Sequence, residues 1–325
     1  MDAFRFTSIP GSTFLIENVP FLRYMPPWFP GAGFQATFET WRAASERMVE
    51  QPYVRAKANM VRLPSTRVFL RNSYDTIVGA ALGSGGLPAE EREMIVKNVA
   101  CVTYVAGVDT TLGTLYTFFL ASNLFPEAQK KAQAELYAVV GPNRLPDYPD
   151  RDRLPYVNAL IRECHRWLPI GPLSLPHATL EDDEYDGYFI PAGAAVLPNI
   201  WSMLHDPAEY PERETFRPER FLNADGSLNS DVRDPATVAF GFGRRICPGR
   251  HFAERTLFLN IARVLHTFDI TPALDDRGQP IVIEPRMKNA LVSGPVDCRC
   301  TIKPRSARAE ALIREVSSDL FGGRP

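Results

Sequence analysis

Phe240–Gly249 reads F-G-F-G-R-R-I-C-P-G and is the most informative segment of this chain. Its cysteine, Cys247, stands just ahead of a predicted helix start at Pro248 or Gly249, where free backbone N–H groups and the helix dipole stabilise a thiolate. The glycines of the segment allow a tight turn and a close approach of the backbone to a flat ligand. The residues alone leave two interpretations: a ligand-binding thiolate, or a buried free cysteine in a glycine-rich turn.

A pair of opposite charges lies upstream, on a helix predicted over residues 154–168. Glu163 and Arg166 occupy the ends of E-C-H-R, at positions i and i+3, so they share one helical face and can pair. Such pairs are common on solvated surfaces. The spacing therefore predicts the pair but not its role.

A third segment lies in a long apolar helix predicted from residue 88 to about 123. Ala106–Thr111 reads A-G-V-D-T-T and sets polar side chains inside an apolar helix, where they need hydrogen-bond partners. A threonine can donate to the carbonyl four residues earlier, and a glycine permits a local bulge. The segment is either an internally satisfied kink or a functional site.

Together these segments resemble the cytochrome P-450 family of haem-thiolate monooxygenases, in particular its fungal secondary-metabolism members. The haem-binding loop of that family follows the pattern F-x-x-G-x-R-x-C-x-G. The residues of this chain that match it are Phe240, Gly243, Arg245, Cys247 and Gly249. The resemblance implies that Cys247 is the axial ligand of the iron of haem b, and that the other matching residues hold the cofactor.

The resemblance also gives the charged pair a role. In the family, the glutamate and arginine of E-x-x-R join an arginine from a segment reading P-E-R-F. Residues 218–221 of this chain read P-E-R-F and supply Arg220. Glu163, Arg166 and Arg220 are therefore expected to form a buried charge network beside the haem loop, with a structural role.

The segment in the long helix resembles the family's oxygen-activation stretch. By that likeness Thr110 would help to deliver protons to dioxygen, and Asp109 would belong to the proton relay. Ala106 and Gly107 would leave room above the haem plane. Retention of the Asp109–Thr110 pair argues against an isomerase or dehydratase that uses thiolate-bound iron without dioxygen.

Further contacts follow from the resemblance alone. Arg245 and His177 would bind the haem propionates, although His177 is equally well explained as an ordinary loop histidine. The expected contacts to a small apolar substrate are Val105, Leu173, Leu175, Leu291 and Val292, any of which could instead belong to the core.

The expected fold class is mainly α with small β-sheets, as a cytochrome P-450 fold truncated at the amino terminus. We expect one partial domain over residues 1–325, with a lid-helix region at 1–88 and the central helix, E-x-x-R helix and haem-binding core at 89–325. The sequence pattern predicts further helices at 35–57, 69–81, 126–140 and from 248 or 249 to 268, short strands at 188–190 and 195–197, and hairpins within 281–302. The proline-broken apolar loop 14–34 is expected to lie in the core, to contact a membrane peripherally or to line a substrate entrance.

Composition excludes some classes of function. The 325 residues carry a net charge of −2, and no block of lysine or arginine is present, so no nucleic acid is expected as a partner. Five scattered cysteines fit a reducing compartment better than a disulfide framework. With no G-x-G-x-x-G segment, the electrons would come from NADPH through a separate NADPH–cytochrome P-450 reductase.

The expected function is the insertion of one oxygen atom from dioxygen into an apolar small molecule, for which a terpenoid or a polyketide are the open choices. The alternative is a truncated, catalytically inactive remnant that binds haem poorly or not at all. The family likeness implies the cytoplasmic side of the endoplasmic reticulum membrane. The sequence itself offers no anchor, which makes the cytosol the other expectation.

Overall fold

The computed structural model describes residues 16, 19–26, 28–29, 33–62 and 88–321. The helix predicted at 69–81 lies outside these residues, as does part of the apolar loop 14–34. The chain divides into two compact units, Met1–Asp109 and Thr110–Pro325, and the boundary falls inside one long helix. The division predicted between a lid region and a core at residues 88 and 89 stays a prediction.

The first unit is built on helix α3 (Phe34–Arg62), which confirms and extends the helix predicted at 35–57. Its buried ring Tyr53 lies beneath the ammonium group of Lys97, with 5.0 Å between the nitrogen and the ring centroid. The same ammonium pairs with Glu50 at 3.0 Å. A cation over an aromatic face and an ion pair thus join α3 to the helix that follows it within this unit.

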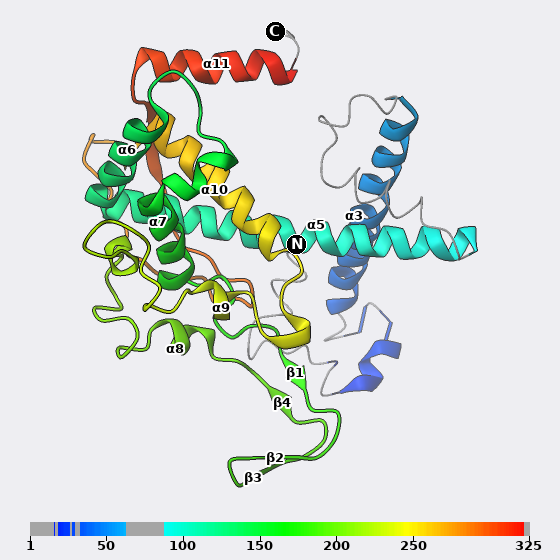
Figure 1. The fold of residues 1–325 in the computed structure, drawn as a ribbon. Coiled ribbons are helices and arrows are strands. Elements are labelled where there is room, and N and C mark those ends of the chain that lie inside the picture. The colour runs from blue at the N-terminus through cyan, green and yellow to red at the C-terminus, as the bar shows by residue number, and fades with distance from the viewer. Residues whose placement is uncertain (1–15, 17–18, 27, 30–32, 63–87, 322–325) are drawn as a thin grey trace. The chain divides into compact units, whose positions relative to one another are not determined.

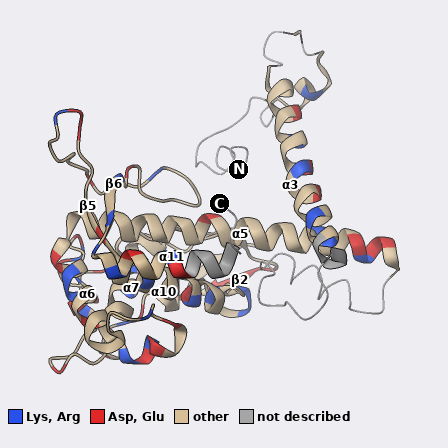
Figure 2. Cartoon of the chain, turned by 90° about the horizontal axis from the view of Figure 1, so that it is seen from above, with Lys and Arg blue, Asp and Glu red and all other residues tan. Residues whose placement is uncertain are grey.

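That following helix is α5 (Ala89–Leu124), which agrees closely with the prediction. Glu90 and Glu91 lie in its first turn, where the helix dipole favours negative charge. Figure 2 shows that charged residues are few along the rest of α5. Several of its large apolar side chains are exposed, including Val102 at 67%. None of the helices in the described part of the chain combines the length and the apolar character that crossing a bilayer requires.

The second unit packs the end of α5 with α6 (Pro126–Val140), α7 (Pro155–Trp167) and α10 (Arg250–Thr267) around an apolar core. Figure 1 shows the ribbons of these helices lying together. The fully buried core includes Leu160 and Phe258, from α7 and α10. All three helices agree with the predicted ranges to within about two residues. Short elements connect them: η3 (Tyr148–Arg153), α8 (Ile200–Leu204), η4 (Pro218–Phe221), α9 (Ala236–Ala239) and η5 (Gly243–Arg245). In the first unit the short helix η1 (Pro20–Tyr24) precedes α3.

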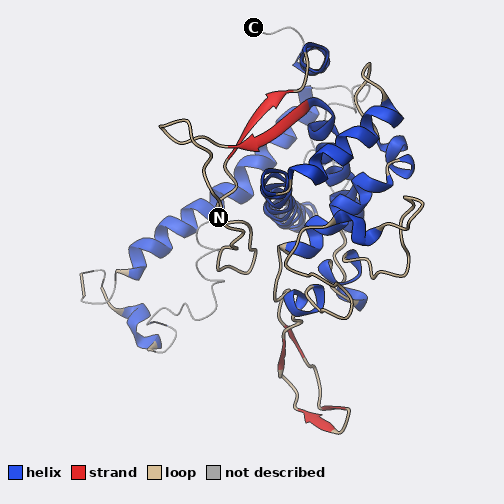
Figure 3. Cartoon of the chain, turned by 90° about the vertical axis from the view of Figure 1, so that its left-hand side faces the viewer, coloured by secondary structure: helices blue, strands red, loops and turns tan. Residues whose placement is uncertain are grey.

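Within the described residues, the strands form three antiparallel pairs, and Figure 3 shows these strands as arrows. They are β1 (His177–Ala178) with β4 (Ala195–Val196), β2 (Asp183–Tyr185) with β3 (Tyr188–Ile190), and β5 (Phe268–Pro272) with β6 (Cys300–Pro304). The predicted strands at 188–190 and 195–197 are confirmed. The described chain is therefore mainly helical with small sheets, which is the predicted fold class.

Hairpins were predicted within 281–302, and the structure has one short antiparallel turn there. Met287 and Pro295 form an isolated bridge, flanked by hydrogen bonds from the Lys288 N–H to Gly294 and from the Val296 N–H to Arg286. The end of this range belongs instead to β6, which pairs with β5 directly after α10. Helix α11 (Ala307–Phe321) was not predicted. The Ser306 side chain accepts a hydrogen bond from the Ala309 N–H and so caps its first turn.

Candidate functional site

The cysteine segment forms a closed loop between α9 and α10. The N–H of Cys247 donates to the carbonyl oxygen of Phe240 at 2.8 Å, and the N–H of Ile246 donates to that of Gly243 at 3.2 Å. Helix α10 then begins at Arg250, whose N–H points back to the Cys247 carbonyl at 3.4 Å. The loop therefore holds a half-buried thiol at the start of an 18-residue helix.

Three glycines of this loop serve different purposes. Gly241 and Gly243 have φ angles of +77° and +54°, a region that side chains with a β-carbon rarely adopt. Gly249 is different, because a β-carbon there would lie 3.8 Å from the sulfur of Cys247. The first two allow the turn, and the third keeps the space beside the sulfur clear.

A buried charge network lies on the neighbouring helix α7 and on η4. Arg166 donates from Nε and Nη2 to the two carboxylate oxygens of Glu163, at 2.7 and 2.8 Å. Arg220 donates from Nε to Glu163 Oε1 at 3.2 Å, and the backbone N–H of Arg217 donates to the same oxygen at 2.8 Å. All three charged side chains are almost completely buried. The structure thus brings together the residues predicted to form a network.

The other N–H groups of the two arginines donate hydrogen bonds to backbone carbonyls of one connecting segment, 204–215. Arg166 donates to the carbonyl oxygens of Leu204, Arg213 and Thr215 at 3.3, 2.8 and 3.3 Å. Arg220 donates to three carbonyls of the same segment, at 2.7 to 3.3 Å. Burial lowers the pKa of Arg220 and the nearby Glu163 carboxylate raises it. One ion cluster therefore fixes a long connection that has little regular structure.

The predicted oxygen-activation residues lie on α5, which continues as an α-helix through them. Val105 and Asp109 are partly buried. Asp109 is the last residue of the first unit, and Thr110 is the first residue of the second. The carbonyl oxygen of Thr110 accepts a hydrogen bond from Thr114 Oγ1 at 3.2 Å. This threonine bonds back to the carbonyl four residues earlier, but it lies outside Ala106–Thr111, so the back-bonding expected of a threonine within that segment stays a prediction.

Two predicted substrate contacts lie on a turn that packs against α5 in the second unit. Leu291 and Val292 are partly buried, and the next residue, Ser293, donates its N–H to the carbonyl of Ile170 at 2.7 Å. A β-carbon on Gly294 would lie 3.8 Å from the Cα of Gly113. The turn and the helix thus approach through a pair of glycines.

Replacing Gly113 by valine is expected to lower the free energy of unfolding by about 1–3 kcal/mol, because the site is already full. A β-carbon at this position would lie 2.8 Å from the Cδ1 of Ile170. Gly107 on the same helix offers a matched control, since a β-carbon there meets nothing within 4 Å. Urea unfolding of both valine variants checks the prediction, and an equal change in the two would contradict it.

The other predicted contacts are more exposed. Leu173 and Leu175 follow α7 in an irregular segment, and His177 is an exposed residue of β1 opposite Val196. Arg245 is exposed at the end of η5. The contacts of His177 and Arg245 to the haem propionates remain predictions.

Comparison with known proteins identifies the family. The family model described as cytochrome P-450 matches residues 65–297, which is more than half of the chain. This chain belongs to the cytochrome P-450 family. The cysteine loop and the Glu163 network lie inside the matched region.

The P-450 relatives are fungal. The chain is 40% identical to cytochrome P-450 monooxygenase COX2 of Coprinopsis cinerea over 320 residues, which cover 98% of this chain and 60% of that protein. It is 42% identical to cytochrome P-450 monooxygenase 208 of Postia placenta, covering 96% of this chain and 58% of that protein. It is 40% identical to cytochrome P-450 monooxygenase claR of Ampulloclitocybe clavipes, covering 97% and 56%. The chain thus spans somewhat more than half the length of these curated relatives.

The residues of this P-450 loop fit the haem that the family implies. Within the described residues, no group of three His, Cys, Asp or Glu side chains could hold a bare metal ion. A single thiol suits a cofactor that brings its own ring of nitrogen ligands, and Cys247 offers a half-buried thiol in this loop. Phe242, in the same loop, is 42% exposed and offers apolar surface to a flat ring. Cys247 would hold such a cofactor through its iron, and Gly249 would leave the sulfur accessible.

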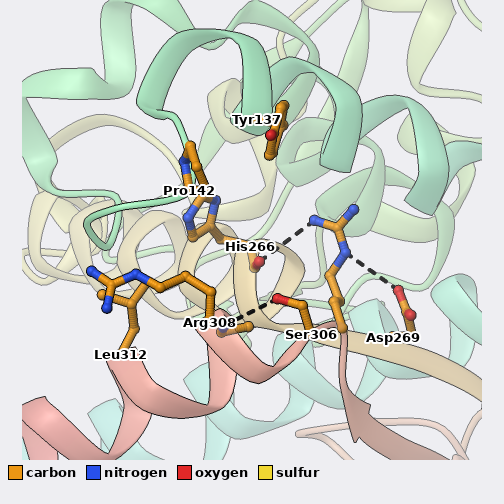
Figure 4. A pocket seen from close by; sticks show the side chains of 9 residues that line it. Tyr137, Pro142, His266, Asp269, Ser306, Arg308 and Leu312 are labelled. Atoms are coloured by element: carbon orange, nitrogen blue, oxygen red, sulfur yellow. Dashed lines mark hydrogen bonds and ion pairs between the residues drawn. The ribbon is translucent and has the colours of Figure 1, made fainter.

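A cavity of about 260 Å³ lies elsewhere in this P-450, between α11 and the helices α6 and α10 (Figure 4). It is lined by side chains of α6, α10, α11 and the end of β6, including His266 and Arg305. Arg305, directly after β6, pairs at 3.4 Å with Asp269 of the neighbouring strand β5, which also lines the cavity. None of the residues predicted to bind haem or substrate lines this cavity.

The sequence did not single out His165, which the structure places against the P-450 cysteine loop. Its ring meets that of Phe240 at 5.3 Å between centroids. The sequence carried no signal for this contact. His165 stands inside E-C-H-R, but only the structure shows that Cys164 and Arg166 on either side of it are buried.

Proposed function

We propose that this chain is a haem-thiolate monooxygenase that inserts one oxygen atom from dioxygen into an apolar small molecule. The observation that supports it is the closed loop that holds the Cys247 thiol at the start of α10, with Gly249 clearing the space beside the sulfur. When bound, a haem with a thiolate axial ligand supplies dioxygen activation, because the thiolate pushes electron density toward the iron. The printed names of the fungal relatives as monooxygenases agree with this proposal.

The other predicted site residues are proposed to have separate roles, according to the element on which each lies. Phe240, Gly243 and Gly249 are proposed to shape the haem-binding loop, and the Glu163 network to keep the adjoining segment rigid. The Thr110 hydroxyl and the Asp109 carboxylate are proposed to move protons during oxygen activation. The substrate is proposed to be a small apolar molecule of fungal secondary metabolism, of terpenoid or polyketide type.

The proposal extends to the partners. Electrons would come from NADPH through a separate NADPH–cytochrome P-450 reductase, at the cytoplasmic face of the endoplasmic reticulum membrane. Of the described helices, none could span that membrane. Contact of this chain with that membrane is proposed to be peripheral.

A second candidate function, an inactive P-450 that binds haem poorly or not at all, is favoured by one observation. Helix α5 leaves large apolar side chains exposed, among them Val99, Val102 and Tyr104. Exposed apolar surface of this kind costs about 25 cal/mol per Å² relative to burial. A chain that is poorly stabilised around its central helix would load haem weakly.

Haem binding separates the two candidates. The reduced carbon monoxide difference spectrum of the purified chain is expected to show a red-shifted Soret band of the thiolate type. Cys247→Ala is expected to abolish that band, because it removes the axial sulfur. Cys300→Ala is the matched control, since Cys300 packs against the apolar core and is expected to leave the band unchanged. No band in the unaltered chain would favour the inactive form.

A further inference from the structure

His165 of helix α7 contacts Phe240 of the cysteine loop, and Phe240 in turn is hydrogen-bonded to Cys247. Its imidazole packs edge to face against the ring of Phe240, with 5.3 Å between centroids and 65° between planes. The carbonyl oxygen of Phe240 accepts the hydrogen bond from the N–H of Cys247 at 2.8 Å. The residue whose ring contacts His165 thus also supplies the carbonyl that holds the backbone N–H of Cys247.

The helix side of this contact is fixed. Cys164 and Arg166, the residues on either side of His165, are completely or almost completely buried. Arg166 is held by five hydrogen bonds, two of them to Glu163. The Cα of His165 therefore has little freedom, and its ring is a fixed surface for Phe240.

Filling space does not explain why this residue is aromatic. The Nε2 atom of His165 is shielded from solvent and has no hydrogen-bond partner in the described part of the chain. Burial lowers the pKa of His165 to about 4, so the ring is neutral near pH 7. A buried polar atom without a partner costs stability, and leucine would fill the same space without that cost. An aromatic edge directed at Phe240 is what leucine could not supply.

We infer that His165 is a positioning residue for Cys247, which acts by holding Phe240 so that its carbonyl fixes the cysteine N–H. This inference rests on the proposed function for its consequence at the haem, but the positioning itself is a property of the chain. Loss of the contact would loosen the turn that presents the sulfur. The thiol would then be less well aligned to serve as an axial ligand.

The amide hydrogen of Cys247 reports the positioning directly, with or without haem. Its exchange in the full chain, measured by mass spectrometry at peptide resolution, is expected to be roughly threefold to tenfold faster in His165→Ala, because an aromatic pair is lost. His165→Phe keeps an aromatic edge and is expected to restore the slow exchange. Val157→Ala, in the core about two turns earlier in α7, controls for a general loss of stability.

The outcomes are distinct. Unchanged exchange at Cys247 in His165→Ala, or an equal acceleration in Val157→Ala after correction for global unfolding, would overturn the inference. The carbon monoxide difference spectrum adds the consequence: His165→Ala is expected to lose part of the thiolate-type band and His165→Phe to regain it. If the unaltered chain shows no such band, the proposed function fails, while the exchange measurement still decides the role of His165.

Discussion

Replacing Arg166 by methionine is expected to lower the free energy of unfolding by about 3–5 kcal/mol, the cost of breaking a buried ion pair from one side. Methionine fills much of the same volume, so the loss is mainly electrostatic. Glu163 would lose two hydrogen bonds from the arginine. The carbonyls of Leu204 and Arg213 would lose the Arg166 donor, whereas that of Thr215 would keep its hydrogen bond from Arg220. Urea unfolding followed by circular dichroism measures the change.

Arg162 offers a matched control on the same helix. It pairs with Asp234 at 3.0 Å, and both side chains are partly solvated. Exposed pairs contribute about 0–1 kcal/mol, so Arg162→Met is expected to cost little. If Arg166→Met cost no more than Arg162→Met, the network would not hold the segment 204–215 in the way described.

Acid is expected to destabilise the chain between pH 6.5 and about 4. Burial lowers the pKa of His165 from 6.5 to about 4. Below pH 6.5 the unfolded chain binds the proton and the folded chain does not, so stability falls as pH falls through this window. The loss from His165 alone approaches about 3 kcal/mol at pH 4. Burial also lowers the pKa of His205 and His266, which adds to the same trend.

His165→Phe tests this assignment, because it keeps an aromatic ring but removes the titrating group. Its stability is expected to fall less steeply than that of the unaltered chain between pH 6.5 and 4, whereas Val157→Ala is expected to shift the whole curve without changing its slope. Asp150 belongs to a separate window, since hydrogen bonds from Arg144 hold its pKa well below 3.8. A parallel slope in His165→Phe would show that His165 does not contribute.

The sequence predicted the parts of the fold that depend on local periodicity. Helices α5, α6, α7 and α10 have clear ends, such as the proline that opens α6 and the carboxylates that open α5. The pairing of β5 with β6 could not be predicted in the same way, because it joins residues 268–272 to residues 300–304 across a long excursion. Distant strand pairing depends on what the intervening chain packs against.

The candidate site shows the same division. Cys247 and the loop glycines follow from a short pattern, and so does the pairing of Glu163 with Arg166. The role of His165 could not be read from the sequence, since its partner Phe240 lies 75 residues further along the chain. Nor could the sequence show that the arginines bind backbone carbonyls, because every residue presents the same carbonyl group.

That last feature bears on how this protein can change over evolutionary time. Arg166 and Arg220 hold the segment 204–215 by main-chain oxygens, which do not depend on the identity of the side chains. Substitutions at exposed positions of the segment are therefore nearly neutral for the anchor, provided that the path of the chain is preserved. Insertions or deletions there would displace the oxygens and be selected against. The segment is expected to keep a constant length in related proteins while its amino-acid sequence varies.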